Sequence, residues 1–213
     1  MKNINNIGLD DKASQITAAQ WNERYGNEEY IYGTQPNQFF KQQLDAQSYG
    51  SVLLPAEGEG RNAVYAAMNN CDVTAFDISS SGKEKAMKLA LSQNVTIDYQ
   101  IENVLNFKSD KKFDIIGLSY AHFPVDIRKK AHLHLLKFLK PQGVVIFEAF
   151  AKAQLGNPSG GPQSEAMLFS IEEAKSEFPD VDFQILKEES ITLYEGNYHK
   201  GKAEVIRFVG VKK

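Results

Sequence analysis

The sequence has few residues that can hold a metal ion or form a disulfide. Among its 213 residues there is one cysteine, Cys71, and there are four histidines. A single cysteine excludes an intramolecular disulfide and an all-cysteine metal site, and it fits a reducing compartment. No histidines pair four residues apart with a carboxylate, and His132 and His134 stand two apart on an expected helix, where their side chains diverge. The sequence therefore predicts no metal site.

Long apolar runs and an excess of positive charge are also missing. No segment approaches the roughly 18 consecutive apolar residues of a membrane-spanning helix, and the N-terminal stretch shows no secretory signal pattern. The formal net charge is −3, which gives no electrostatic reason to expect a nucleic acid or an anionic membrane as partner. We expect a cytoplasmic protein that acts on a small molecule. The sequence does not indicate an oligomeric state.

What is present is a globular composition with alternating strand and helix patterns. Hydrophobic residues make up 42% of the chain and charged residues 24%, which is typical of one soluble domain of this length. Short apolar runs predict strands at 51–56, 71–78, 95–101, 112–120 and 141–150, with helices between most of them. This alternation predicts a parallel, doubly wound α/β sheet. Two further strands, 182–196 and 202–213, are joined by a short Gly/Asn connection and predict an antiparallel hairpin.

Local signals predict where several helices begin. Thr17 is a candidate N-cap for a first helix that ends near Gly26, and Pro36 is placed to open a second helix at its first position. Ser170 and Glu173 form the pattern of a capping box at the start of a late helix.

The stretch "LLPAEGEGRNAV", Leu53–Val64, combines a strand, a glycine turn and a helix start. Gly58 and Gly60 have no Cβ atom, so a ligand can approach the backbone, and a helix beginning near Arg61 would direct free N–H groups at an anion. Asp77 follows at the end of the next strand, where a carboxylate suits a bidentate grip on ribose hydroxyls. The pattern predicts a nucleoside-containing cofactor. Because "GEGRNA" also fits G-x-G-x-x-A, a nicotinamide-dependent oxidoreductase is an alternative.

Taken in order, these motifs resemble those of the class I S-adenosylmethionine-dependent methyltransferases. The segments "WNERYGNEEYIYGTQPNQF", "GEGRNAVY", "GGP" and "EGNYHKG" resemble a small bacterial subgroup described as tellurite-resistance-type or thiopurine-methyltransferase-like. The resemblance covers roughly residues 17–213. It implies a Rossmann-like, seven-stranded sheet whose last strand is antiparallel. It also implies an N-terminal helical cap over residues 1–48 and an S-adenosylmethionine-binding domain over residues 49–213.

The resemblance implies roles for individual residues. In this family the glycine turn lines the amino-acid moiety, Asp77 holds the ribose, and adenine recognition falls on Asn103 and the N–H of Val104, with Glu102 as a neighbour that can serve instead. Ser119 lies at the carboxyl edge of the sheet. The implied cofactor-binding residues are Trp21, Ala56, Glu57, Gly58, Gly60, Asn62, Asp77, Ile78, Asn103, Val104 and Ser119.

The turn departs from the family pattern at two positions. Leu54 stands where the family has an acid that fixes the cofactor amino group, and Ala56 replaces the first glycine. We therefore hypothesise that Glu57 lies near the positive amino or sulfonium end of the cofactor.

The segment "SYAHFP" follows the fourth strand at the ligand-binding edge of the sheet. Tyr120 and His122 are the candidate catalytic residues, with a loop hydrogen bond as the structural alternative for His122. Tyr30, Tyr32 and His199 are candidates for the acceptor pocket; core packing and turn chemistry are the alternatives for these residues.

No conspicuous base is present beyond His122 and His199, which favours an easily ionised acceptor such as a thiol or a chalcogen oxyanion. The expected activity is methyl transfer from S-adenosyl-L-methionine, with S-adenosyl-L-homocysteine as product. A non-catalytic protein that binds the cofactor remains an alternative, because Leu54, Ala56 and Asn103 depart from the family pattern.

Overall fold

The computed structural model describes residues 12–47 and 50–213. Its first half contains α1 (Lys12–Tyr25), α2 (Gln38–Asp45), β1 (Ser51–Pro55), α3 (Arg61–Met68), β2 (Asp72–Asp77), α4 (Ser80–Ser92), β3 (Asp98–Ile101) and β4 (Phe113–Ser119). The second half contains α5 (Val125–Leu136), β5 (Leu139–Phe150), two short 3-10 turns, α6 (Ile171–Glu177), β6 (Val181–Glu195) and β7 (His199–Lys212). Residues 1–11 and 48–49, which include part of the expected cap, lie outside the described residues.

The strands form one seven-stranded sheet in the order β3-β2-β1-β4-β5-β7-β6. Strands β1 to β5 pair in parallel, whereas β7 runs antiparallel to both β5 and β6. The predicted α/β sheet with a terminal antiparallel hairpin is therefore confirmed. From β1 the chain adds β2 and β3 on one side, and it then crosses to add β4 and β5 on the other side of β1. Proteins with α/β folds bind ligands at the carboxyl ends of the strands beside such a switch point.

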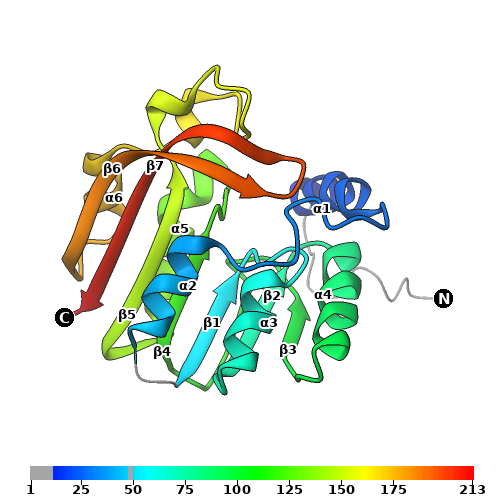
Figure 1. The fold of residues 1–213 in the computed structure, drawn as a ribbon. Coiled ribbons are helices and arrows are strands. Elements are labelled where there is room, and N and C mark those ends of the chain that lie inside the picture. Colours follow the sequence, from blue (N-terminus) through cyan, green and yellow to red (C-terminus); the bar gives the residue numbers. More distant parts are fainter. Residues whose placement is uncertain (1–11, 48–49) are drawn as a thin grey trace.

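Helices cover the two faces of the sheet (Figure 1), and an apolar cluster lies between the sheet and the helices on each face. Along β1, Val52 and Leu54 pack with α2, α3 and α4, whereas Leu53 packs on the opposite face with residues of α5 and α6. This alternation follows from the period of two in a strand. All five residues of β1 are buried, which is typical of a parallel strand covered by helices on both sides.

The N-terminal helices begin at other residues than the local signals predict. Thr17 lies inside α1, where its hydroxyl donates to the carbonyl of Ala13 at 3.0 Å, so it is not an N-cap. The cap of α2 is Asn37, whose side chain accepts from the N–H of Phe40, and Pro36 precedes this cap. The asparagine side chain accepts from one of the first N–H groups of the helix, which have no partner within the helix itself. The capping box of Ser170 and Glu173 is confirmed.

The β6–β7 hairpin reaches back over the carboxyl edge of the sheet to α1 and the segment that follows it (Figure 1). Its loop packs so closely there that a Cβ atom on Gly196 would lie 2.3 Å from the carbonyl oxygen of Ile31. The guanidinium of Arg24 lies over the ring of Tyr198 at 5.5 Å and over the ring of Trp21 at 5.1 Å. The hairpin loop, residues 196–198, and α1 thus form a common roof over the carboxyl edge of the sheet.

Candidate active site

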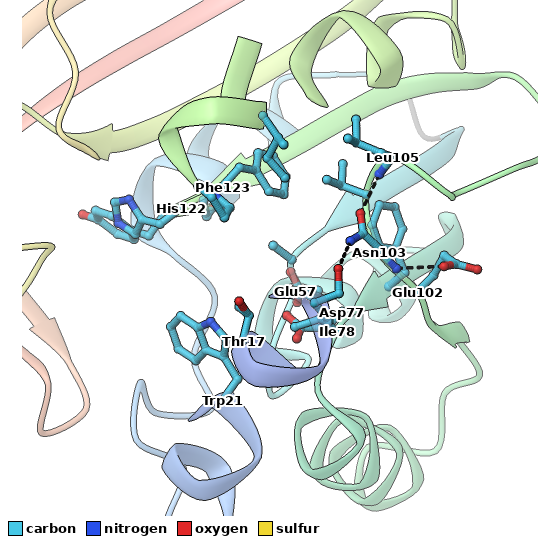
Figure 2. Close-up of a pocket in the computed structure, with 18 of the residues that line it drawn as sticks. Thr17, Trp21, Glu57, Asp77, Ile78, Glu102, Asn103, Leu105, His122 and Phe123 are labelled. Carbon is cyan, nitrogen blue, oxygen red and sulfur yellow. Dashed lines mark hydrogen bonds between the residues drawn. The ribbon is translucent and has the colours of Figure 1, made fainter. Parts of the chain in front are cut away.

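A pocket of about 400 Å³ lies beneath this roof, at the carboxyl ends of β1, β2 and β4. Figure 2 shows Thr17 and Trp21 on α1 across from His122 and Phe123, with Asp77 and Asn103 to the right. Most of the predicted site residues line this pocket: Trp21, Tyr32, Ala56, Glu57, Asn62, Asp77, Ile78, Asn103, Val104, Ser119, Tyr120, His122 and His199. Three others do not line it: Tyr30, Gly58 and Gly60.

The two glycines are required by the packing inside the turn. Gly58 has φ +62°, and a Cβ atom there would lie 2.6 Å from the hydroxyl of Tyr25. Gly60 has φ +87°, and its Cβ would lie 2.5 Å from the Cβ of Ala86 on α4. Both positions combine a left-handed backbone with close neighbours, so only glycine fits. Ala56, where the family has glycine, is also left-handed at φ +51°.

Gly60→Ala is expected to lower the free energy of unfolding by about 3 kcal/mol. The change combines the strain of a left-handed alanine with overpacking against α4. Gly156→Ala is the matched control, since its φ is +85° and nothing lies within 4 Å of the added Cβ. Backbone strain alone should cost the control about 1 kcal/mol. Urea unfolding of both variants measures the difference, and equal losses would contradict the packing explanation.

Tyr30 belongs to the packing between the cap and α4, so its predicted place in the acceptor pocket is wrong. Its hydroxyl donates to the carbonyl of Lys85 at 2.9 Å, and the Lys85 ammonium lies 4.9 Å from its ring centre. Lys85 also forms an ion pair with the buried Glu59 at 2.5 Å. These contacts hold the Tyr30 ring against α4 instead of directing it into the pocket.

Glu57 caps α3. Its carboxylate accepts from the N–H groups of Asn62 and Ala63, both at 2.7 Å, and from the side-chain amide of Asn62 at 3.3 Å. The helix start therefore lacks the free N–H groups that the sequence suggested at these two residues. Burial raises the pKa of Glu57 to about 7, although the hydrogen bonds from Ala63 and Asn62 favour the charged form. The carboxylate still lines the pocket, so it can interact with a cationic ligand group.

Asp77 is fixed at the end of β2 by the backbone. One carboxylate oxygen accepts from the N–H of Gly58 at 2.9 Å, and the other accepts from the N–H of Ser79 at 2.8 Å. Burial raises the pKa of Asp77 to about 6, partly offset by these hydrogen bonds. The N–H of Ile78 also favours the charged form, and the side chain lines the pocket. A rigid carboxylate in this place can accept two hydrogen bonds from a vicinal diol.

Asn103 links the loop after β3 to the roof. Its side-chain oxygen accepts from the N–H of Leu105 at 2.9 Å, and its amide donates to the hydroxyl of Ser14 on α1 (Figure 2). Glu102 accepts from the N–H of Asn103 at 2.8 Å, and Val104 and Ile78 add apolar surface nearby. This end of the pocket offers polar edges beside apolar side chains, which suits a heteroaromatic base.

The opposite end is a cluster of aromatic and imidazole rings. The ring of Tyr120 lies 4.6 Å from those of Phe150 and His199, and His122 stacks on Phe150 at 5.9 Å. Tyr120 has φ +53°, a strained conformation of the kind that concentrates at functional sites. Among the described residues, the hydroxyl of Tyr120 and both ring nitrogens of His122 are buried with no hydrogen-bond partner. Burial lowers the pKa of His122 to about 3, so its imidazole is neutral at physiological pH.

Sequence reasoning missed a buried network that joins this end to the hairpin. Arg61 on α3 lines the pocket and pairs with Glu195 at 2.9 Å, and Glu195 lies 3.4 Å from Nδ1 of His199. Arg61 and Glu195 are 134 positions apart in the sequence. The one available signal was that an arginine directly follows the glycine turn. Among residues 12–47 and 50–213, no cluster of His, Cys, Asp or Glu is arranged to hold a metal ion, and no helix is long and apolar enough to cross a membrane.

Residues 52–143, from β1 to the start of β5, match the family model described as "Methyltransferase domain". The chain is similar to TehB from Haemophilus influenzae, with a TM-score of 0.69, 15% identity and coverage of 92% of this chain and 67% of that one. The fold is that of a class I methyltransferase. Magnesium protoporphyrin IX methyltransferase from Synechocystis PCC 6803, solved with S-adenosylhomocysteine bound, gives a TM-score of 0.70 at 15% identity, covering 94% of this chain and 99% of that one.

The curated relatives are longer proteins, and the match covers only part of them. Ubiquinone biosynthesis O-methyltransferase from Rickettsia bellii is 25% identical over 97 residues, which are 46% of this chain and 40% of that protein. The chain therefore matches less than half the length of these relatives. The likeness is therefore one of fold over most of the chain and of a methyltransferase domain over residues 52–143.

Proposed function

We propose that this protein transfers a methyl group from S-adenosylmethionine to a small-molecule acceptor, a thiol or a chalcogen oxyanion. The observation that carries the proposal is Asp77, a rigid, pocket-facing carboxylate at the end of β2. The rest of the pocket fits the cofactor: Asn103 lies at the end suited to a heteroaromatic base, and Glu57 offers negative charge for a sulfonium or amino group. When bound, S-adenosylmethionine supplies a methyl group on a positively charged sulfur that leaves as a neutral thioether.

The residues at the aromatic end support a role in binding the acceptor. Tyr120 and His122 present polar atoms that are buried without partners, and such atoms are stabilised by a polar ligand. Because burial lowers the pKa of His122 to about 3, its imidazole is a weak base, and we assign it to orienting the acceptor rather than to taking its proton. His199 carries Glu195 on Nδ1, so Nε2 is the ring nitrogen that can accept a proton. An acceptor that ionises readily needs little more than such positioning and the exclusion of water.

Ligand binding tests this proposal against the nicotinamide-dependent alternative. S-Adenosylhomocysteine at 1 mM, a concentration on the order of 100 times a micromolar-range Kd, should raise the melting temperature by several degrees. The reduced nicotinamide cofactor should cause no shift and no change in its own fluorescence. The opposite result would favour an oxidoreductase. If neither ligand raises the melting temperature, the proposal loses its basis.

A further inference from the structure

Arg61 is the one arginine or lysine among the described residues that line the pocket. The lining also contains four acids, Glu57, Asp77, Glu102 and Asp126. An anionic group of a ligand is repelled near these carboxylates and attracted near the guanidinium. Arg61 is 7% exposed, so water screens its charge only weakly.

The Arg61 side chain is held in place from two sides. One terminal nitrogen donates to Glu195 at 2.9 Å, and the other donates to the carbonyl of Tyr32 at 3.3 Å. Glu195 is fixed in turn by the side-chain amide of Asn37 at 2.9 Å. These contacts use two of the five N–H groups of a guanidinium, so the group has further donors. The geometry is that of an oriented donor whose counter-ion is buried beside it.

The N-terminal end of α3 is the other place in the pocket where an anion could bind, but the Glu57 carboxylate already occupies it. The N–H groups of Asn62 and Ala63 both donate to the Glu57 carboxylate at 2.7 Å. A second carboxylate there would lie against the first and have no N–H group of these two residues to accept from. The attraction of a helix start for anions is therefore satisfied within the protein.

We propose that Arg61 binds the α-carboxylate of the cofactor and that Glu57 faces its amino and sulfonium groups. The inference rests on the proposed function, since it assigns the amino-acid end of that cofactor. The formal charges agree with it. The lining carries four acids and one arginine, which favours a ligand of net positive charge, and S-adenosylmethionine, with a carboxylate, an ammonium and a sulfonium, sums to +1. Its carboxylate is then placed beside Arg61 and away from these acids.

Two ligands that differ only at this end test the proposal. 5′-Methylthioadenosine shares the adenosine thioether of S-adenosylhomocysteine but has no amino-acid group. For Arg61→Gln we expect calorimetry to show at least a 30-fold loss of affinity for S-adenosylhomocysteine and less than a 3-fold change for methylthioadenosine. Arg61→Lys should retain part of the lost affinity, because it keeps the charge without the planar fork.

Folding of the variants needs its own control, because Arg61→Gln leaves Glu195 buried without its partner. The double variant Arg61→Gln/Glu195→Gln removes both charges and should show the same selective loss. If Arg61→Gln weakens both ligands equally, or weakens neither, the assignment of Arg61 is wrong. If the wild-type protein binds neither ligand, the proposed function itself fails, so the two failures are distinguishable.

Discussion

Asp77→Asn is expected to weaken binding of S-adenosylhomocysteine by about 100-fold, because two charge-assisted hydrogen bonds to the ligand diol are lost or weakened. The amide keeps one oxygen and replaces the other with an NH₂ group. That group would also face a backbone N–H, of Gly58 or of Ser79, which now donates to the carboxylate. Isothermal titration calorimetry measures the loss of affinity.

The matched control for this variant is Asp98→Asn on β3, since Asp98 is exposed and outside the pocket. It should bind the ligand as tightly as the wild type. Circular dichroism and thermal unfolding establish that Asp77→Asn is folded at the titration temperature. Wild-type affinity in a folded Asp77→Asn variant would show that Asp77 does not hold the ribose.

Glu57 is expected to make cofactor binding depend on pH. Burial raises its pKa to about 7 in the free protein, and a cationic ligand group beside it favours the ionised form. Below pH 7, binding of S-adenosylmethionine must therefore release a proton, and the affinity should fall by about tenfold between pH 8 and pH 6. Asp77, with a pKa of about 6, contributes mainly at the acid end of this range.

Glu57→Gln tests this assignment. The variant should bind S-adenosylmethionine at least 10-fold more weakly at pH 8, with little change in affinity between pH 8 and pH 6.5. Calorimetry in buffers of different ionisation enthalpy detects the released proton in the wild type. If Glu57→Gln binds as tightly as the wild type and shows the same pH profile, Glu57 does not face the cationic end.

The raised pKa of Glu57 also makes the free energy of unfolding depend on pH. The folded-state pKa of Glu57 is raised from 4.5 to about 7, so the folded protein binds this proton more tightly than the unfolded chain. Its contribution to the free energy of unfolding is complete below about pH 4.5 and is lost as pH rises through 7. Thermal unfolding between pH 5 and pH 7.5 should show a smaller fall in Glu57→Gln than in the wild type.

Much of the fold could be predicted because its signals are local. Strand runs and helix periods lie within segments of about ten residues, and their alternation restricts the sheet to parallel, doubly wound arrangements. The position of Asp77 follows from the same logic, since it ends the strand beside the glycine turn. The terminal hairpin was equally readable from the short Gly/Asn connection between its strands.

What could not be predicted depends on contacts between distant segments. The side chain of Arg61 is oriented by Glu195, which reaches it only after the β6–β7 hairpin folds back over the sheet. Tyr30 and Tyr32 are neighbours in an aromatic loop, yet the first packs on Lys85 and the second lines the pocket. The glycine turn around Glu57 predicts that this residue lies near the cofactor. Its hydrogen bonds with the N–H groups at the start of α3 depend on the conformation of the turn, which the sequence pattern does not show. No pattern in the chain distinguishes these outcomes.

The central claim is methyl transfer, and product formation tests it most directly. The purified protein would be incubated with methyl-labelled S-adenosylmethionine and a panel of thiols and chalcogen oxyanions, and both the methylated product and S-adenosylhomocysteine would be measured by mass spectrometry. We predict equimolar label in an acceptor and S-adenosylhomocysteine in solution, with Asp77→Asn strongly impaired. Tight binding of S-adenosylmethionine without label in any acceptor, including those of a small-molecule cell extract, would contradict the account and indicate a non-catalytic binding protein.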